Sequence, residues 1–254
     1  MPLEIKVFRC LSDNIGVLVR DADAGLCIAV DAPDSDTIIK HLDDSDWQLT
    51  DILVTHSHTD HVQGIAALKD KYGCFVTAPL KAEDIIPEAD AFVSEGDLIS
   101  LGELEIDVIE TPGHCDDHVA YIVQSHGIAF VGDVLFTLGC GRVFGDYQDM
   151  WDSIERLRNL PDDIQIFCGH DYTLSNGRFA LAVEPDNHRL KERFAEAEKL
   201  AAENRFMVPF ALVDEKATNP FLRVEVPEVS RSVNMEGAAP FEVFKALREW
   251  KNKF

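Results

Sequence analysis

The heptapeptide THSHTDH, at residues 55–61, most limits what this chain can be, because it crowds three histidines and an aspartate into one segment directly after an apolar run. On a helix, His56 and His58 would point to nearly opposite sides, whereas in an extended segment residues i and i+2 share a face. We therefore expect His56 and His58 to act together at a strand end or in a loop. Asp60 and His61 lie further along and can point to a second centre, so one short cluster could serve two metal ions.

Three later apolar runs also end at a histidine or an aspartate. TPGH ends at His114, IAFVGD ends at Asp133 and IQIFCGH ends at His170. Loops at strand ends carry the functional side chains of α/β proteins, so four strand ends are expected to converge on one pocket. Imidazole and carboxylate groups suit Zn²⁺, Mn²⁺ and Fe²⁺, and these side chains make two sites of about four ligands each if one aspartate is shared. The remaining histidines, His41, His118, His126 and His188, are expected to be packed or solvated, with His118 a candidate for a supporting position.

The pattern of strands and helices indicates an α/β fold. Expected strands are residues 17–19, 26–30, 52–54, 75–78, 105–109, 119–123, 128–131 and 164–168, and expected helices in the same part are residues 62–72 and 149–160. After residue 170 the strand signals fade, and residues 189–204 and 241–253 have helical patterns. We therefore predict an α/β part with sheets covered by helices, followed by a smaller α-helical part that packs against it.

The composition excludes several classes of function. The chain has 254 residues, of which 46% are hydrophobic and 27% charged, which are ordinary globular values. Its longest apolar runs are far shorter than the roughly 20 residues that cross a bilayer, and the start MPLEIKVFRC lacks a leader, so we expect a cytoplasmic protein, most simply a monomer. The net charge of −23 argues against nucleic acid or an anionic membrane as partner. The six cysteines form no CxxC pair and are expected to be reduced, buried thiols.

The order of the motifs resembles a known superfamily. THSHTDH, followed by TPGH, GD and GH, is similar to the metallo-β-lactamase superfamily, whose fold is an αββα sandwich of two β-sheets with helices on both outer faces. This pattern covers residues 1–170 and is specific for the superfamily, but not for one reaction. The resemblance implies a metal-binding catalytic domain over that range.

Three further stretches resemble one family within it, glyoxalase II, the hydroxyacylglutathione hydrolases. They are GCGRVF at residues 139–144, CGHDYT at residues 168–173 and NPFLRV at residues 219–224, with LREWKNKF closing the chain. Members of that family carry a C-terminal helical domain that supplies part of the glutathione site. The resemblance therefore implies that residues 171–254 form a helical, glutathione-binding domain, and it covers nearly the whole chain.

The resemblance also implies roles for the seven candidate ligands. It assigns His56, His58 and His114 to one divalent metal ion, Asp60, His61 and His170 to a second, and Asp133 to a bridging position. The expected metal is Zn²⁺, with iron and manganese as alternatives, because the same ligands accept all three. A hydroxide shared by the two cations would attack a thioester carbonyl, with Asp60 orienting it. The implied reaction converts an S-(2-hydroxyacyl)glutathione, typically S-D-lactoylglutathione, to glutathione and a 2-hydroxy acid, the second step of methylglyoxal detoxification.

Five residues match the family's glutathione-binding positions. They are Arg142 of GCGR, Phe144 two residues later, Tyr172 of GHDY, and the C-terminal pair Arg248 and Lys251. Some members have a tyrosine in place of Phe144, and the missing hydroxyl is expected to weaken binding by ~0.5–1.5 kcal/mol. Glutathione carries two carboxylates. The three cations among these residues, Arg142, Arg248 and Lys251, would let a very acidic chain bind an anionic small molecule.

Two alternatives remain open at this point. The nearer one is a glutathione persulfide dioxygenase, which resembles glyoxalase II in fold and in its use of glutathione but relies on a single iron. The other is a different hydrolase of the metallo-β-lactamase fold. Metal count separates the first alternative from a binuclear hydrolase, because two metals and oxygen-independent turnover favour the hydrolase.

Overall fold

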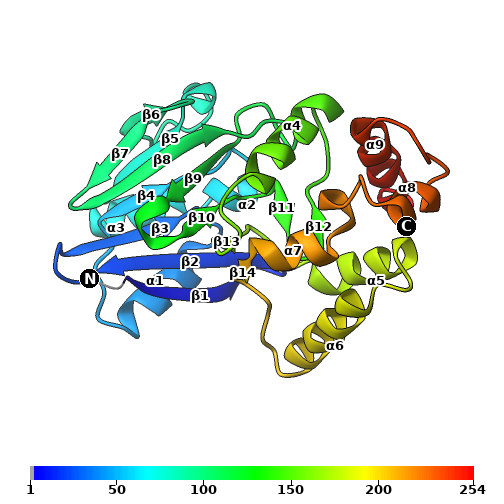
Figure 1. The fold of residues 1–254 in the computed structure, drawn as a ribbon. Coiled ribbons are helices and arrows are strands. Elements are labelled where there is room, and N and C mark those ends of the chain that lie inside the picture. The colour runs from blue at the N-terminus through cyan, green and yellow to red at the C-terminus, as the bar shows by residue number, and fades with distance from the viewer. Residues whose placement is uncertain (1–2) are drawn as a thin grey trace.

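The computed structural model describes residues 3–254 and contains two six-stranded β-sheets (Figure 1). The first sheet comprises, in spatial order, β1 (Glu4–Cys10), β2 (Asn14–Asp21), β3 (Leu26–Val30), β4 (Asp51–Leu53), β5 (Phe75–Pro79) and β6 (Ala91–Val93). β2 is antiparallel to both β1 and β3, whereas β3 to β6 run parallel to one another. The parallel strands β3, β4 and β5 end at the same edge of the sheet, and the 55–61 segment leaves from β4 there.

The second sheet has the order β14-β13-β10-β9-β8-β7. Its strands are β7 (Leu98–Leu101), β8 (Leu104–Glu110), β9 (Val119–Val123), β10 (Ile128–Phe130), β13 (Gln165–Phe167) and β14 (Phe210–Ala211). β14 comes from beyond residue 170 and pairs with β13, where Ile166 lies opposite Phe210. The chain after residue 170 is mainly helical, as predicted, but a two-residue strand is too short to give an alternating pattern.

Alternating side chains bury both faces of the first sheet. In β3, Ile28 and Val30 belong to the core shared with the second sheet, whereas Cys27 and Ala29 belong to a separate core with the helices on the outer face. Those helices are α1 (Ser35–Asp43), α2 (Thr59–Val62) and α3 (Ile65–Tyr72). Successive residues of a strand point to opposite faces, so this alternation produces a helix–sheet–sheet layering.

Helix α4 (Tyr147–Arg158) packs its buried residues Met150, Ile154 and Leu157 into the same core as β9 and β10. The metallo-β-lactamase-type αββα sandwich predicted from the sequence is therefore present. Between β10 and α4, the short strands β11 (Leu135–Phe136) and β12 (Gly139–Cys140) pair as a hairpin.

The C-terminal helices gather at one end of the sandwich, in yellow to red in Figure 1. They are α5 (Thr173–Val183), α6 (His188–Ala202), α7 (Leu212–Thr218), α8 (Pro227–Ser232) and α9 (Pro240–Lys251); the 3-10 helices η1 (Leu80–Ala82), η2 (Gln124–His126) and η3 (Pro220–Leu222) complete the fold. Phe244 of α9 contacts Trp151 of α4 with ring centroids 5.4 Å apart. The two parts of the chain thus share one continuous core.

The helix expected over residues 62–72 is interrupted. α2 ends at Val62 and α3 begins at Ile65, because the Gly64 N–H donates to the Ala32 carbonyl oxygen at 2.8 Å and not to a carbonyl within the helix. Gly73 ends α3 in the left-handed conformation with φ +65, as expected for a helix stop. Within residues 3–254, no helix is both long and apolar enough to cross a bilayer.

Candidate metal centre and substrate cavity

The four strand ends converge as the sequence predicts. His56 and His58 lie in the loop after β4, His114 follows β8, Asp133 follows β10 and His170 follows β13. His58 is the residue that precedes the first turn of α2, so Asp60 and His61 lie inside that turn and point to the other side of the centre. The structure therefore divides the seven candidate ligands into two groups that meet at Asp133.

The first group is formed by three imidazoles and one carboxylate. The Nδ1 atom of His58 lies 3.0 Å from Nε2 of His56 and 3.0 Å from Nε2 of His114. Oδ2 of Asp133 lies 3.5 Å from Nε2 of His114. Donor atoms bound 2.0–2.1 Å from a tetrahedral zinc ion lie about 3.3 Å from one another. These spacings resemble those of donors in one coordination site, and one ligand atom each of His56, His114 and Asp133 lies within 4.8 Å of the other two.

The second group comprises Asp60, His61 and His170, again with Asp133. The Nε2 atoms of His61 and His170 are 3.2 Å apart, and Oδ2 of Asp60 lies 3.3 Å from Nε2 of His170. Oδ1 of Asp133 lies 3.6 Å from Nε2 of His61, and its Oδ2 lies 3.3 Å from Nε2 of His170. Oδ1 of Asp133 is buried without a hydrogen-bond partner among residues 3–254. A buried carboxylate oxygen that lacks a donor fits a cation.

The electrostatics of the centre also favour positive charge. Burial, followed by the neighbouring imidazoles, lowers the pKa of His56 well below its ordinary value, which keeps its lone pair available. Burial lowers the pKa of His61 as well, but the carboxylates of Asp133 and Asp31 outweigh it and raise that pKa to about 9. Burial raises the pKa of Asp133, yet the surrounding histidines lower it further than burial raises it. The carboxylates that raise the pKa of His61 would also stabilise a metal cation beside it.

Outer hydrogen bonds orient four of the imidazoles. Their Nδ1 atoms contact Thr55 Oγ1 at 3.0 Å (His56), Asp31 Oδ2 at 2.8 Å (His61), the Arg142 carbonyl oxygen at 2.9 Å (His114) and Asp13 Oδ1 at 2.9 Å (His170). Partners of this kind fix the tautomer and direct Nε2 toward the metal. Asp13 and Asp31 are functional residues that the sequence analysis does not identify. Asp31 could have been found, because it ends the apolar run LCIAVD in the same way that Asp133 ends its own.

The position of Asp133 depends on Gly132, Gly169 and His118. Gly132 has φ +45, and Nε2 of His118 accepts a hydrogen bond from the backbone N–H of Asp133 at 3.0 Å. His118 thus takes the supporting position for which it was a candidate. Gly169 serves differently, because a Cβ there would lie 2.4 Å from Oδ1 of Asp133. Its lack of a side chain makes space for the carboxylate.

A cavity of about 290 Å³ opens beside the two groups. It is lined by His58, Asp60, His114, Asp133, Phe136, Arg142, Phe144, His170 and Tyr172. Tyr172 stacks on His170 with ring centroids 4.9 Å apart, and the exposed Phe144 meets His58 edge to face at 5.9 Å. Three of the five predicted substrate-binding residues, Arg142, Phe144 and Tyr172, therefore lie at the metal groups.

Arg248 and Lys251, the other two, do not line this cavity. Arg248 is only 5% exposed, and its Nη1 donates to the carbonyl oxygens of Cys140 at 3.0 Å and Gly141 at 3.4 Å. Lys251 donates from Nζ to the Ser175 carbonyl oxygen at 3.2 Å. Arg248 therefore holds the two residues that directly precede Arg142.

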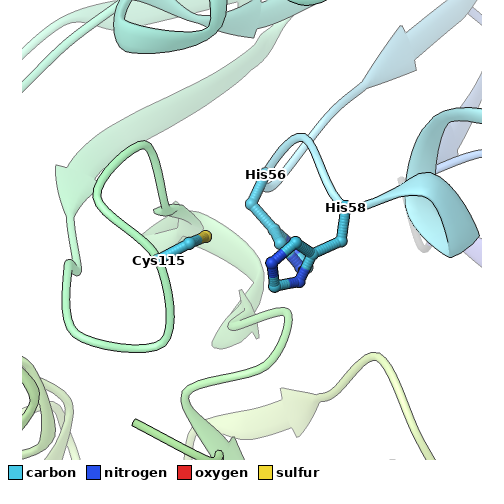
Figure 2. A group of neighbouring side chains, drawn as sticks. All are labelled: His56, His58 and Cys115. Carbon is cyan, nitrogen blue, oxygen red and sulfur yellow. The ribbon is translucent and has the colours of Figure 1, made fainter. Parts of the chain in front are cut away.

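Cys115 also lies against the centre, which the sequence analysis does not predict. Figure 2 shows its sulfur directed toward the imidazoles of His56 and His58. One ligand atom from each of these three residues lies within 4.8 Å of the other two. Cys115 is half-buried, whereas the other five cysteines are buried as expected.

Comparison with known proteins identifies the family. Residues 21–170 match the sequence model of the metallo-beta-lactamase superfamily, and residues 171–254 match that of the hydroxyacylglutathione hydrolase C-terminus. A hydroxyacylglutathione hydrolase from Methylobacterium sp. (strain 4-46) is 53% identical over 253 residues, covering 99% of both chains. One from Bradyrhizobium sp. (strain BTAi1) is 50% identical over 254 residues, covering 100% of both. The chain belongs to the hydroxyacylglutathione hydrolase family. The resemblance to glyoxalase II stated from the sequence is thereby confirmed.

Solved structures support the fold. The structure of ETHE1 from Myxococcus xanthus superimposes with a TM-score of 0.69 at 24% identity, covering 98% of this chain and 90% of that one. The BLEG-1 B3 metallo-beta-lactamase gives a TM-score of 0.66 at 20% identity, covering 86% of this chain and 99% of that one. At such identities the likeness concerns architecture alone. The family assignment therefore rests on the sequence matches, including that of residues 171–254 to the hydroxyacylglutathione hydrolase C-terminus.

Proposed function

We propose that this protein hydrolyses thioesters formed between glutathione and a 2-hydroxy acid, with S-D-lactoylglutathione as the representative substrate. The observation that carries the proposal is the full-length match to hydroxyacylglutathione hydrolases combined with two adjoining groups of metal-binding side chains. The products would be glutathione and a 2-hydroxy acid. The assignments to the cytoplasm and to a monomer remain predictions.

The proposed cofactors are two divalent cations, Zn²⁺ in the first instance, held by the two ligand groups with Asp133 between them. Bound cations of this kind supply a water of lowered pKa and a Lewis acid for the carbonyl oxygen. The unpartnered oxygen of Asp133 and the spacing of the imidazole nitrogens support this assignment. Iron and manganese suit the same donors.

Asp60 is proposed to orient the attacking water. Its side chain is 42% exposed and lines the cavity, and Asn14 donates to its Oδ2 at 3.1 Å. Burial raises the pKa of Asp60, but the hydrogen bond from Asn14 and the nearby histidines lower it overall, so this carboxylate is ionised and can accept a proton from water in a hydrogen bond. The departing thiol has a pKa near ~8.5, so its thiolate leaves without a general acid.

The peptide part of the substrate is proposed to lie across Arg142 and Tyr172. Arg142 is the cation that lines the cavity, and its guanidinium suits a carboxylate of glutathione. Tyr172 offers a hydroxyl beside it, whereas Phe144 offers only an apolar ring. Arg248 and Lys251 are assigned to the same substrate on the family resemblance, with Arg248 acting through the loop that it holds.

The deciding experiment combines metal analysis with turnover. We expect the purified protein to contain two divalent metal ions per chain and to release thiol from S-D-lactoylglutathione with oxygen excluded. Exhaustive chelation should abolish turnover, and His58→Ala should lose metal and activity together. His188→Ala, at an exposed position, is the matched control and should retain both. A single metal with oxygen-dependent turnover would favour the persulfide dioxygenase alternative, and turnover that survives chelation would contradict the proposal.

A further inference from the structure

We propose that Cys115, together with His56 and His58, forms a sulfur-containing ligand set that binds a thiophilic divalent cation such as Cd²⁺ in competition with the nitrogen–oxygen set of the first metal group. This goes beyond the hydrolysis of thioesters, because it assigns a binding property to a residue that the proposed reaction does not use.

The position of Cys115 supports the assignment. It directly follows His114 in the loop between β8 and β9, and its carbonyl oxygen accepts a hydrogen bond from the Gly113 N–H at 3.2 Å, which closes the loop. Its sulfur faces the two imidazoles (Figure 2), with the three ligand atoms within 4.8 Å of one another. Zinc–sulfur bonds are about 2.3 Å and zinc–nitrogen bonds about 2.0–2.1 Å, so a cation between the three atoms needs only a small movement of the side chains.

Accessibility separates Cys115 from the other thiols. It is half-buried, whereas Cys10, Cys27, Cys74, Cys140 and Cys168 are buried. Among residues 3–254, no other cysteine belongs to a group of three potential metal ligands. A cation that binds to sulfur in this protein is therefore expected at Cys115.

The chemistry follows from the donors. A thiolate is softer than a carboxylate and favours soft cations, and a thiol proton is released to solvent as the sulfur–metal bond forms. His56 and His58 are already adjacent, with their donor atoms 3.0 Å apart, so the pair can serve either set. His114 and Asp133 complete the pair in one ligand set, and Cys115 completes it in the other.

Competition for the shared imidazoles has a functional consequence. A cation bound by Cys115 also uses His56 and His58, which then no longer coordinate together with His114 and Asp133. The metal ion of the first group then loses two of its ligands and is displaced. Thiophilic cations are therefore expected to inhibit hydrolysis by displacing the metal ion of the first group. The second group contains neither His56 nor His58 and keeps its ligands.

The test is a Cd²⁺ titration of the purified, metal-loaded, full-length protein, followed by ultraviolet absorption and by elemental analysis after gel filtration. We expect a cadmium–thiolate charge-transfer band equivalent to one cysteine per chain and the release of one resident metal ion. Cys115→Ser and Cys115→Ala should lose the band and weaken Cd²⁺ binding by at least about tenfold, the lower range found when support for a metal ligand is removed. Cys74→Ser, a substitution in the core of the first sheet, is the control and should keep the band.

The thiolate band and Cd²⁺ binding require neither thioester hydrolysis nor a resident metal ion, so failure of the proposed function leaves these readouts intact. Resident metal content equal to that of the unmodified protein shows that the Cys115 variants are folded. Cd²⁺ that binds without a thiolate band, or with a band that persists in both Cys115 variants, would overturn the proposal. Loss of the band in Cys74→Ser alone would overturn it as well.

Discussion

Replacing Arg248 with methionine separates two ways in which a buried arginine can affect substrate binding. The sequence resemblance assigns Arg248 to direct contact with glutathione. In the structure its guanidinium is buried and donates to the carbonyl oxygens of Cys140 and Gly141, immediately before Arg142. We therefore expect Arg248→Met to raise KM by releasing Arg142, with no loss of metal.

The magnitude follows from the contacts. A hydrogen bond from a charged donor is worth about 1.5–3 kcal/mol, and the 3.0 Å bond to Cys140 belongs to this class, whereas the 3.4 Å contact to Gly141 is weaker. The guanidinium of Arg248 lies over the Phe221 ring, with its carbon atom 5.3 Å from the ring centroid, and methionine replaces the guanidinium with an apolar group of similar reach. The free energy of unfolding is thus expected to fall by about 2–3 kcal/mol, measured by urea denaturation.

A double-mutant cycle distinguishes positioning from contact. If Arg248 acts by holding Arg142, then Arg248→Met should raise KM in the parent but have little further effect in an Arg142→Met background. Lys251→Met, whose Nζ donates to the Ser175 carbonyl oxygen and not to the carbonyl oxygens of this loop, is the control and should add its full effect in both backgrounds. Equal increases in KM from Arg248→Met with and without Arg142 would show direct contact with the substrate and refute the reasoning.

Three further outcomes are expected. Gly169→Ala places a Cβ 2.4 Å from Oδ1 of Asp133. Elemental analysis should therefore show less metal than in the parent protein, and kcat should fall at least about tenfold. A variant with full metal content and full activity would contradict this. Burial and the neighbouring arginine lower the pKa of Lys251 below its ordinary 10.5, so this cation is lost at a lower pH than a solvated lysine would be; KM for the anionic thioester should rise with pH as it is lost, and Lys251→Arg should give a flat profile. Asn219→Ala removes a donor from the buried Gly139 carbonyl, at 2.9 Å, and should lower the free energy of unfolding by about 2–4 kcal/mol in urea, so an unchanged midpoint would count against the contact.

The candidate metal ligands can be predicted from the sequence because they follow strands. The apolar run, the turn residue and the ligand form a local pattern, and the common edge at which such strands end brings the ligands together. Asp31 fits this pattern less clearly, because its run ends in DAP without a histidine or glycine beside it. Asp13 has no apolar run before it, and only the structure shows that it orients His170.

The burial of Arg248 depends on contacts that are remote in sequence. An arginine near the end of an amphipathic helix is usually solvated, and the helical pattern of residues 241–253 gives no reason to expect otherwise. Phe221 packs beneath its guanidinium, and Cys140 lies more than a hundred positions earlier, with a sequence separation of 108 residues. Local periodicity therefore finds the helix, but it does not decide whether this cation faces solvent, substrate or backbone.

The hairpin β11–β12 joins the two functions of the centre. Asp133 precedes the hairpin and Arg142 follows it. The shape of the hairpin therefore sets the distance between the candidate metal ligands and Arg142, the proposed substrate-binding cation. Three side chains from beyond residue 170 hold successive backbone groups of this hairpin: Glu215 accepts from the Leu138 N–H at 2.8 Å, Asn219 donates to the Gly139 carbonyl at 2.9 Å and Arg248 donates to the Cys140 carbonyl at 3.0 Å.

This arrangement argues against independent action of the two parts of the chain. Leu138 has φ +60, a conformation that costs free energy for a branched side chain and persists only where surrounding contacts stabilise it. Those contacts come from helices beyond residue 170, although Leu138 itself belongs to the catalytic part. A boundary at residue 170 thus divides the motifs in sequence, but the geometry between the metal groups and Arg142 depends on side chains from both sides of it.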